Sequence, residues 1–361
     1  YRNGEKIMEK KINVAIVGYG GMARCWHIKR LKEMTDIFEI VGAYDIDPER
    51  NRLFEEDSGV KAFSSMDELL NSGKVELAIV AVPNDVHKPV CIELLEHKIN
   101  VICEKPVCLS SEELEVMIAA ANKNGMVFTA HQNRRWDEDF LSVKKVYDEN
   151  ELGKIFRIES RVHGSRGIPG DWRNQKCHGG GMVLDWGIHL FDQLYCLTGW
   201  DDIVSVHADL TYVTNAEVDD GFSVTLKFRN GLVAFVEVGT SNFIELPRWY
   251  VQGENGSMVI NDWNMNGKIV KVTDWENRDA VPVQTSAGMT KTMAPRTDDT
   301  IATFPIPRVP SDERDYYRNV AKAIHGEEKQ LITHDQLRRT MKLMEAVFRS
   351  GETGEVIKET I

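Results

Sequence analysis

The chain has 361 residues, which at about 100–200 residues per domain indicates two domains, each long enough to bury a core. Its 44 Lys and Arg against 56 Asp and Glu give a net charge of −12, and this sign repels phosphate backbones, so we expect no nucleic-acid partner. The composition, 42% hydrophobic and 28% charged, is that of a globular protein and excludes the disordered and fibrous classes.

The sequence also gives no sign of a membrane or export segment. Its longest apolar runs, such as Leu77–Pro83, are far shorter than the about 20 residues that a membrane helix needs. The stretch Tyr1–Lys11 is charged, so we interpret it as an extension ahead of a candidate start at Met8. The cysteines are sparse, which favours reduced thiols in a cytoplasm over a disulfide scaffold. They are Cys25, Cys91, Cys103, Cys108, Cys177 and Cys196.

From Lys11 to about Arg135, short β-branched runs alternate with helical patterns, which predicts βαβ units on a parallel sheet. The expected strands are Ile12–Val17, Ile37–Tyr44, Leu77–Val82, Asn100–Cys103 and Met126–Ala130. The expected helices are Met22–Glu33, Pro48–Asp57, Met66–Asn71, His87–His97 and Ser111–Asn124. Asp47 before Pro48, and Ser110 three residues before Glu113, mark two helix starts.

After Trp136 the pattern changes. We expect a helix over Asp137–Glu149, a strand over Ile155–Val162, a glycine-rich loop, a helix over Met182–Leu197 and antiparallel strands from Ile203 onward. Phe222, Val224, Leu226 and Phe228 alternate with polar residues before the hairpin turn Asn230-Gly231 and the strand Leu232–Val238. One face of this sheet is therefore apolar and suits covering helices, and the other is open to a second subunit.

The C-terminal part has a weakly patterned stretch, Asp274–Pro310, expected as a long loop or arm. Helices over Asp312–Ile324 and His334–Arg349 then end the chain. The fold class expected is an α/β N-terminal Rossmann domain plus an α+β C-terminal domain with a large open, mostly antiparallel sheet. We place a cofactor domain at 8–136 and a substrate-binding and oligomerisation domain at 137–361.

A glycine-rich turn follows the first strand. Gly18-Tyr19-Gly20-Gly21-Met22-Ala23 has the G-x-G-x-x-A spacing of a dinucleotide fingerprint, with a strand before it and a helix after it. Gly18 permits the tight turn, Gly20 lets the main chain approach a pyrophosphate, and Ala23 lets the helix pack closely on the strand. Asp45, at the end of the second strand, stands where a carboxylate meets the adenosine ribose and favours NAD over NADP. A purely structural turn and a solvated strand-end aspartate are the alternatives.

Polar residues also follow the next two strands, at the sheet edge where ligands bind. Asn84 and His87 are candidate cofactor contacts, although a plain strand-to-helix turn has the same composition. Glu104-Lys105-Pro106 ends the following strand, and Lys105 there can place a cation near a nicotinamide. The alternative for Lys105 is an exposed lysine before a helix.

The densest motif is Gly179-Gly180-Gly181 followed by Asp185 and His189. We expect these glycines to let the start of the helix come close to a ligand. Residues i and i+4 of a helix share one face, and an imidazole beside a carboxylate suits a general base near neutral pH. A metal site is the rival interpretation, with ligands drawn from His163, Cys177, His178, Asp185 and His189. No closed-site spacing such as C-x2-C is present, so we expect no metal.

Together these motifs resemble the Gfo/Idh/MocA oxidoreductase family. They are Gly18-x-Gly20-x-x-Ala23, Asp45, Glu104-Lys105-Pro106 and Gly180-Gly181-x-x-x-Asp185-x-Gly187-x-His189. The resemblance implies a Rossmann domain followed by a domain with a large sheet commonly used for oligomerisation. It also implies that Lys105, Asp185 and His189 are the catalytic residues.

The activity expected is hydride transfer between a carbinol carbon of a sugar, polyol or glycoside and NAD. His189 would take the hydroxyl proton, Asp185 would support the imidazolium, and Lys105 would stabilise alkoxide charge. The cofactor-binding set is Gly18, Tyr19, Gly20, Gly21, Met22, Asp45, Pro83, Asn84, His87, Glu104, Lys105 and Gln132. The substrate-binding set is Arg135, His163, Trp172, Arg173 and His189.

Two other functions remain open. One is an enzyme that retains NAD and uses oxidation, β-elimination and reduction to cleave a glycosidic or anhydro bond. The other is a sugar or cofactor sensor without catalysis. In each case the expected partners are a carbohydrate-like molecule and a second copy of the chain, in a homodimer or homotetramer.

Overall fold

The computed structural model of the protein describes residues 10–278 and 280–361, which form two compact units. The first contains the described residues up to Asn133, with Gly170–Ile188 and Asp312–Glu345. The second contains Arg134–Pro169, His189–Ser311 and Ala346–Ile361. The units are therefore interleaved in sequence, and the assignment of binding roles to 8–136 and 137–361 stays a prediction.

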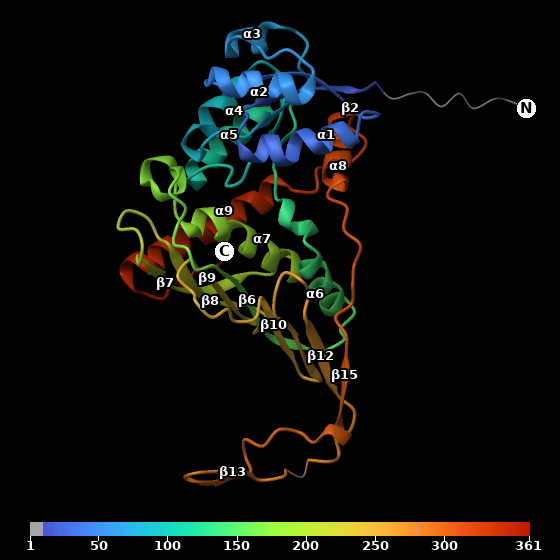
Figure 1. Ribbon diagram of the computed structural model, residues 1–361, viewed down its shortest axis with the longest axis vertical. Coiled ribbons are helices and arrows are strands. Elements are labelled where there is room, and N and C mark those ends of the chain that lie inside the picture. Colours follow the sequence, from blue (N-terminus) through green and yellow to red (C-terminus); the bar gives the residue numbers. More distant parts are fainter. Residues whose placement is uncertain (1–9, 279) are drawn as a thin grey trace, which may run out of the picture. The chain divides into compact units, whose positions relative to one another are not determined.

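The first unit is built on a parallel five-stranded sheet in the order β2-β1-β3-β4-β5 (Figure 1). Its strands are β1 (Ile12–Val17), β2 (Phe38–Tyr44), β3 (Leu77–Val80), β4 (Asn100–Cys103) and β5 (Phe128–Ala130). β3 consists of buried apolar residues, and β4 has three buried apolar residues after Asn100, as strands covered on both faces require. The predicted Rossmann-type sheet is confirmed.

Helices surround this sheet, some connecting its strands and two coming from the C-terminal part of the chain. They are α1 (Ile28–Glu33), α2 (Pro48–Ser58), α3 (Met66–Asn71), α4 (His87–Glu96), α5 (Ser111–Asn124), α8 (Arg314–Ile324) and the first part of α9 (His334–Thr353). The predicted caps of α2 and α5 are present, since Asp47 accepts the Glu49 N–H at 3.0 Å and Ser110 accepts the Glu113 N–H at 3.2 Å. α8 lies beside α1 (Figure 1), and Arg30 Nε contacts Glu313 Oε2 at 3.3 Å.

The strand order places the candidate residues at one edge of this sheet. All five strands run in the same direction, so their carboxyl ends meet at a single edge, where open α/β sheets bind ligands. The glycine-rich turn follows β1, Asp45 follows β2, Asn84 follows β3, Lys105 follows β4 and Gln132 follows β5. The fold thus gathers residues that are up to 114 positions apart in the chain.

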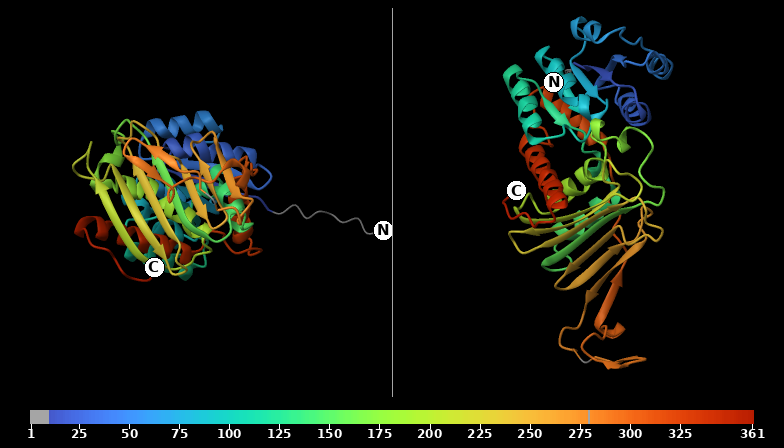
Figure 2. Two further views of the ribbon diagram at one scale, coloured as in Figure 1. Left: turned by 90° about the horizontal axis from the view of Figure 1, so that it is seen from below. Right: turned by 90° about the vertical axis from the view of Figure 1, so that its left-hand side faces the viewer.

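The second unit contains an eight-stranded sheet in the order β15-β12-β11-β10-β6-β9-β8-β7, seen edge-on in Figure 2. Its strands are β6 (Ile155–His163), β7 (Ile203–Thr211), β8 (Gly221–Phe228), β9 (Val233–Gly239), β10 (Trp249–Gly253), β11 (Gly256–Ile260), β12 (Gly267–Val272) and β15 (Ile301–Phe304). Only the β6–β9 pair is parallel. The predicted large, mostly antiparallel sheet is confirmed.

One face of this sheet packs against α6 (Glu138–Asp148) and α7 (Ile188–Leu197). Phe191 of α7 lies 5.9 Å from Phe222 of β8 between ring centroids, and Trp249 Nε1 donates to Asp139 Oδ2 of α6 at 2.8 Å. The opposite face carries polar side chains such as Arg161, whose Nε donates to Glu237 at 3.0 Å. The alternation predicted from the sequence therefore separates a covered face from an open one.

Three local predictions need correction. The stretch Asp274–Pro310 contains a hairpin, β13 (Val283–Thr285) with β14 (Gly288–Thr290), and its β15 pairs with β12, so it is not all loop. The helices predicted over Met22–Glu33 and Met182–Leu197 begin with wide π-type turns at Ala23–His27 and Val183–Gly187.

Within the described residues no helix has the length and apolar character needed to cross a bilayer.

Candidate active site

The glycine-rich turn after β1 fits closely against the end of β3. Gly18 has a φ of +86°, and a Cβ built on it would lie 2.6 Å from the Ala81 carbonyl oxygen, so this position requires glycine. A Cβ on Gly21 would meet nothing within 4 Å, and Gly21 is exposed. The main chain at Gly21 is therefore open to a ligand, as a pyrophosphate site requires.

Asp45 and Tyr19 hold this turn in place. The Asp45 carboxylate accepts the main-chain N–H of Tyr19 at 2.7 Å and that of Asp47 at 2.9 Å. Each of its oxygens keeps a second lone pair for a ribose hydroxyl. The Tyr19 ring is buried against Phe54, and its hydroxyl donates to Asp57 at 2.9 Å. The Tyr19 side chain thus anchors the turn on α2, and its predicted contact with a cofactor stays a prediction.

Pro83 and His87 follow β3 in different environments. Pro83 is exposed at the sheet edge. His87 is fully buried, and its ring nitrogens lie 2.9 Å from the carbonyl oxygens of Val82 and Pro106. Burial lowers the pKa of His87, and the hydrogen bonds to the two carbonyl oxygens oppose that shift. These contacts favour a role in tying together the turns after β3 and β4, and they do not support the predicted direct contact with a cofactor.

The triple-glycine segment packs against the same edge through Asn84. Asn84 Nδ2 donates to the Gly179 carbonyl oxygen at 2.9 Å. A Cβ on Gly179 would lie 2.5 Å from the Leu109 side chain, and one on Gly180 would lie 2.2 Å from the Arg173 carbonyl oxygen. We expected these glycines to let a ligand approach; the structure shows that Gly179 and Gly180 are required by close packing of the protein on itself.

Lys105 and Asp185 meet at the end of β4. Lys105 Nζ donates to Asp185 Oδ1 at 2.8 Å and to the Asp185 carbonyl oxygen at 2.8 Å, and both side chains are largely buried. Arg173 Nε donates to Asp185 Oδ2 at 3.2 Å. Burial raises the pKa of Asp185, but the charges of Lys105 and Arg173 outweigh it and hold that pKa below its usual value. The site therefore contains an ionised carboxylate between two cations.

Arg173 and Trp172 lie next to this pair. The Arg173 guanidinium contacts Asp171 at 2.8 Å and lies 4.6 Å from the centre of the Trp172 ring. Its fork geometry leaves further N–H groups available. Trp172 is half-buried, so part of the ring remains accessible to a sugar face. Their predicted contacts with substrate stay predictions.

His189 is a buried residue at the start of α7, directly after the wide turn Val183–Gly187. A π-type turn has more residues per turn than an α-helix, so the argument that Asp185 and His189 share a face at i and i+4 does not apply in its simple form. The Asp185 carboxylate contacts Lys105 and Arg173. Its support of the His189 imidazolium stays a prediction.

The other predicted substrate residues have partners inside the second unit. Arg135 forms two hydrogen bonds with Asp192, at 2.7 and 2.6 Å. His163, at the end of β6, accepts the Leu246 N–H at 3.2 Å and lies 3.4 Å from Glu237. Both side chains are mostly buried. These contacts show how the two side chains are held in this unit, and their binding of substrate stays a prediction.

Gln132 completes the edge after β5. It is buried, and its Oε1 is without a hydrogen-bond partner among the described residues. A buried amide oxygen in this state favours a bound donor, which supports its place in the cofactor-binding set. Sequence reasoning missed three residues behind it, namely His27, His131 and Glu313, which form a buried polar cluster with Glu104. No local motif contains them, so the sequence offered no signal.

Comparisons with known proteins agree with this arrangement. Residues 12–132 match a family described as an oxidoreductase family with an NAD-binding Rossmann fold, and residues 140–259 match the GFO/IDH/MocA C-terminal domain. The crystal structure of an NAD-binding protein from Listeria innocua is 40% identical, with a TM-score of 0.92 over 97% of this chain and 100% of that chain.

Two curated relatives carry named activities. scyllo-Inositol 2-dehydrogenase (NADP(+)) IolW of Bacillus subtilis is 25% identical over 96% of this chain and 95% of its own length. 2,7-Anhydro-N-acetylneuraminate hydratase of Mediterraneibacter gnavus is 26% identical over 72% of this chain and 70% of its own length. The expected resemblance is confirmed, and the chain belongs to the Gfo/Idh/MocA family of oxidoreductases, whose N-terminal domain is an NAD-binding Rossmann fold.

Proposed function

We propose that the protein transfers a hydride between a carbinol carbon of a sugar, polyol or glycoside and NAD. The observation that carries this proposal is the buried contact of Lys105 Nζ with Asp185 at 2.8 Å. Two residues 80 positions apart meet at the carboxyl edge of the sheet, where the fold binds dinucleotides. A sensor has no use for a buried, ionised lysine–carboxylate pair, so the geometry favours an enzyme.

The residues at this edge fit the cofactor. The main chain at Gly21 is open, the Asp45 carboxylate has lone pairs for a ribose, and Gln132 has a free acceptor. We assign them to the pyrophosphate, the adenosine ribose and the nicotinamide end, in that order. When bound, the nicotinamide supplies the hydride-accepting carbon. Asp45 favours NAD because a carboxylate repels a 2′-phosphate.

Lys105 and His189 have separate tasks in this mechanism. The Lys105 ammonium lies against the Asp185 carboxylate and stabilises the alkoxide charge that forms as the substrate hydroxyl loses its proton. His189 accepts that proton, since a neutral imidazole titrates in the required range. Asp185 orients the lysine, and the second cation, Arg173, fixes the other carboxylate oxygen.

The substrate class follows from the loop beside this pair. Trp172 offers a flat ring for a sugar face, and Arg173 offers N–H groups for hydroxyls or a carboxylate. Arg135 and His163 are further candidates. The named activities of the two relatives, on an inositol and on an anhydro sugar acid, support a ring-shaped polyhydroxylated substrate.

A second candidate is the enzyme that recycles NAD, oxidising, eliminating and reducing in one cycle. The relative named as a hydratase favours it, because a hydratase leaves its substrate with no net redox change. The same lysine, aspartate and histidine would serve both reactions. In either case we propose a homodimer or homotetramer, formed through the open face of the eight-stranded sheet, in a cytoplasm.

A substrate panel separates the two candidates. Sugars, polyols, sugar acids, glycosides and anhydro sugars are each incubated with NAD and the protein, while NADH absorbance and product formation are followed together. A dehydrogenase accumulates free NADH in proportion to product. A recycling enzyme converts substrate without accumulating NADH. Failure of every compound to react, with NAD bound, would contradict both.

A further inference from the structure

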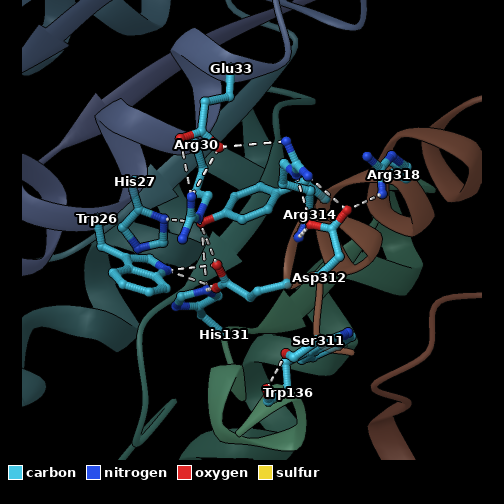
Figure 3. Close-up of polar contacts among 12 residues, drawn as sticks. Trp26, His27, Arg30, Glu33, His131, Trp136, Ser311, Asp312, Arg314 and Arg318 are labelled. Atoms are coloured by element: carbon cyan, nitrogen blue, oxygen red, sulfur yellow. Dashed lines mark hydrogen bonds and ion pairs between the residues drawn. The ribbon is translucent and has the colours of Figure 1, made fainter. Parts of the chain in front are cut away.

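Behind Lys105 lies a buried polar cluster made of His27, Glu104, His131 and Glu313, none of which is more than 8% exposed. His27 comes from the turn before α1, Glu104 from the end of β4, His131 from the end of β5, and Glu313 from the residue before α8. Figure 3 shows His27, His131 and Trp26 converging on this point. The cluster therefore joins four segments of the first unit.

The partners of His131 define its charge. Nδ1 lies 2.8 Å from Glu104 Oε1, and Nε2 lies 2.6 Å from Glu313 Oε1. An ionised carboxylate only accepts hydrogen bonds, so both ring nitrogens must donate, and a ring with two N–H groups is an imidazolium. The other titratable groups facing this ring include Tyr316 and Tyr317 of α8 and His27, whose ring centroid lies 4.5 Å away.

The partners of His27 define a different state. Its Nε2 lies 2.8 Å from the same Glu104 Oε1, and its Nδ1 lies 2.8 Å from the Tyr317 hydroxyl. Nε2 therefore donates, while Nδ1 accepts from the hydroxyl, which is the neutral tautomer. Burial, together with the His131 charge, lowers the pKa of His27, in agreement with this assignment.

The cluster is balanced in charge. Glu104 and Glu313 carry two negative charges, and His131 and Arg30 carry two positive charges, with Arg30 Nε 3.3 Å from Glu313. Trp26 Nε1 donates to Glu313 at 2.7 Å as well. Buried carboxylates remain ionised only with such compensation.

A metal ion is the alternative occupant, because His27, Glu104 and His131 bring three ligand atoms within 4.8 Å of one another. A zinc ion lies about 2.0–2.2 Å from each ligand atom and holds the ligands apart. Here both imidazole nitrogens contact one carboxylate oxygen at 2.8 Å, which is a hydrogen-bond distance. The geometry favours shared protons over a metal.

The other Glu104 oxygen links this cluster to the active site. Glu104 Oε2 accepts the main-chain N–H of Lys105 at 3.2 Å. We propose that His131 is held as an imidazolium between Glu104 and Glu313, and that the resulting ionised Glu104 fixes the main chain from which Lys105 reaches Asp185. His27, Glu104, His131 and Glu313 are positioning residues, and this role rests on the proposed function of Lys105.

The test of the charge needs no substrate. The full chain is labelled with ¹⁵N-histidine, and the ring nitrogens are followed by NMR from pH 6 to pH 10, with His131→Gln identifying the His131 signals. We expect both His131 nitrogens to keep the shifts of a protonated ring at pH 8. A neutral-ring pattern at pH 8 would overturn the proposal. So would bound zinc in the purified protein whose removal by a chelator shifts the His131 signals, because the ring would then be a metal ligand. If His131→Gln does not fold, Glu313→Gln supplies the assignment by shifting the His131 titration to lower pH.

The link to Lys105 is tested by two further measurements. Glu313→Gln and His131→Gln should speed hydrogen exchange at the Lys105 amide by ~10-fold or more. They should also lower kcat by ~10–100-fold and leave KM for NAD unchanged, because a small displacement of a positioned group slows the reaction strongly. The matched control is His334→Gln. The His334 ring forms a hydrogen bond with the Phe128 carbonyl oxygen outside the cluster, so this variant should change neither the exchange rate nor kcat. Faster exchange with unchanged kcat would refute the positioning role. If no compound is turned over, the proposed function fails, while the charge and exchange measurements still decide this inference.

Discussion

Lys105 shares its ammonium group between the carboxylate and the carbonyl oxygen of one residue, Asp185. Lys105→Ala should lower kcat by at least about 10²-fold, because it removes the cation that stabilises alkoxide charge. NAD affinity should change little. Stopped-flow hydride transfer measures the first effect and titration calorimetry the second. Lys123→Ala, which removes an exposed lysine at the end of α5, is the control, and wild-type turnover in Lys105→Ala would remove the lysine from the mechanism.

We propose that Asp45 determines the choice between NAD and NADP. NAD should bind more tightly than NADP, and Asp45→Asn should weaken NAD by about tenfold while affecting NADP less, because the repulsion of a 2′-phosphate is lost. Calorimetry with both cofactors measures this, with the exposed Asp36→Asn as control. Tighter binding of NADP to the wild type would assign the phosphate to Arg50, whose guanidinium approaches Gly20.

The glycines show what could be learned of single residues from sequence. Gly18 was predicted correctly as the residue of a tight turn, because the fingerprint includes the strand and helix on either side. Gly179 and Gly180 were assigned to ligand approach, and their contacts with Leu109 and Arg173 lie outside any local pattern. A glycine's neighbours in space are set by tertiary packing, which one sequence does not reveal.

Among the elements, His131 at the end of β5 connects Glu104 at the end of β4 with Glu313 at the start of α8. Burial opposes that charge, but Glu104 and Glu313 raise the pKa of His131 to about 9. In the unfolded chain the pKa of this histidine is about 6.5. Between pH 6.5 and pH 9 the native state therefore keeps a proton that the unfolded chain has released. The contribution of His131 to stability is fully present below about pH 6.5 and is lost as pH rises through about 9.

This gives a prediction for denaturation. The free energy of unfolding should fall by on the order of 3 kcal/mol between pH 6.5 and pH 9.5 through this group, at ~1.4 kcal/mol per pKa unit. Urea titrations at a series of pH values measure it. His131→Gln should flatten the slope and His334→Gln should keep it. An equal slope in wild type and His131→Gln would show that His131 is not the titrating group.

Elements with a strong local period were predicted well, and elements set by distant partners were not. β1, β4, α3 and α5 have the predicted bounds, since their apolar runs and caps are encoded within the segment. β15 was missed because its four residues, two of them exposed, become a strand only by pairing with β12. The wide turns at Ala23–His27 and Val183–Gly187 likewise have helical composition, so sequence periodicity assigns them to ordinary helices.

At the scale of the whole molecule, the sheet edge of the candidate site was predictable and the cluster behind it was not. Strand order places Asp45, Asn84 and Lys105 at one edge by a general rule for α/β sheets. His131 and Glu313, however, are 182 residues apart. Each resembles an ordinary polar residue in its own segment, so only the folded chain brings their charges together.

The open face of the eight-stranded sheet leads to a prediction about assembly. Light scattering at micromolar concentration should give at least twice the 41.0 kDa chain mass, because an uncovered sheet face favours pairing with a second copy. Phe235→Asp, on the open face of β9, should lower that mass, and Val213→Asp, in an exposed loop, should not. A mass near that of one chain for the wild type would contradict the assembly.

Single-turnover hydride transfer measures whether Lys105 and His189 act on the reacting groups. Protein in excess over NAD is mixed with the substrate found in the panel, and NADH absorbance is followed in wild type, Lys105→Ala, His189→Ala and the exposed control His207→Ala. We expect a rapid NADH signal in wild type and His207→Ala, and a signal slowed by at least about 10²-fold in the other two. Equal rates in all four proteins would contradict the assignment of Lys105 and His189, and product formation without any NADH signal would contradict net hydride transfer to NAD.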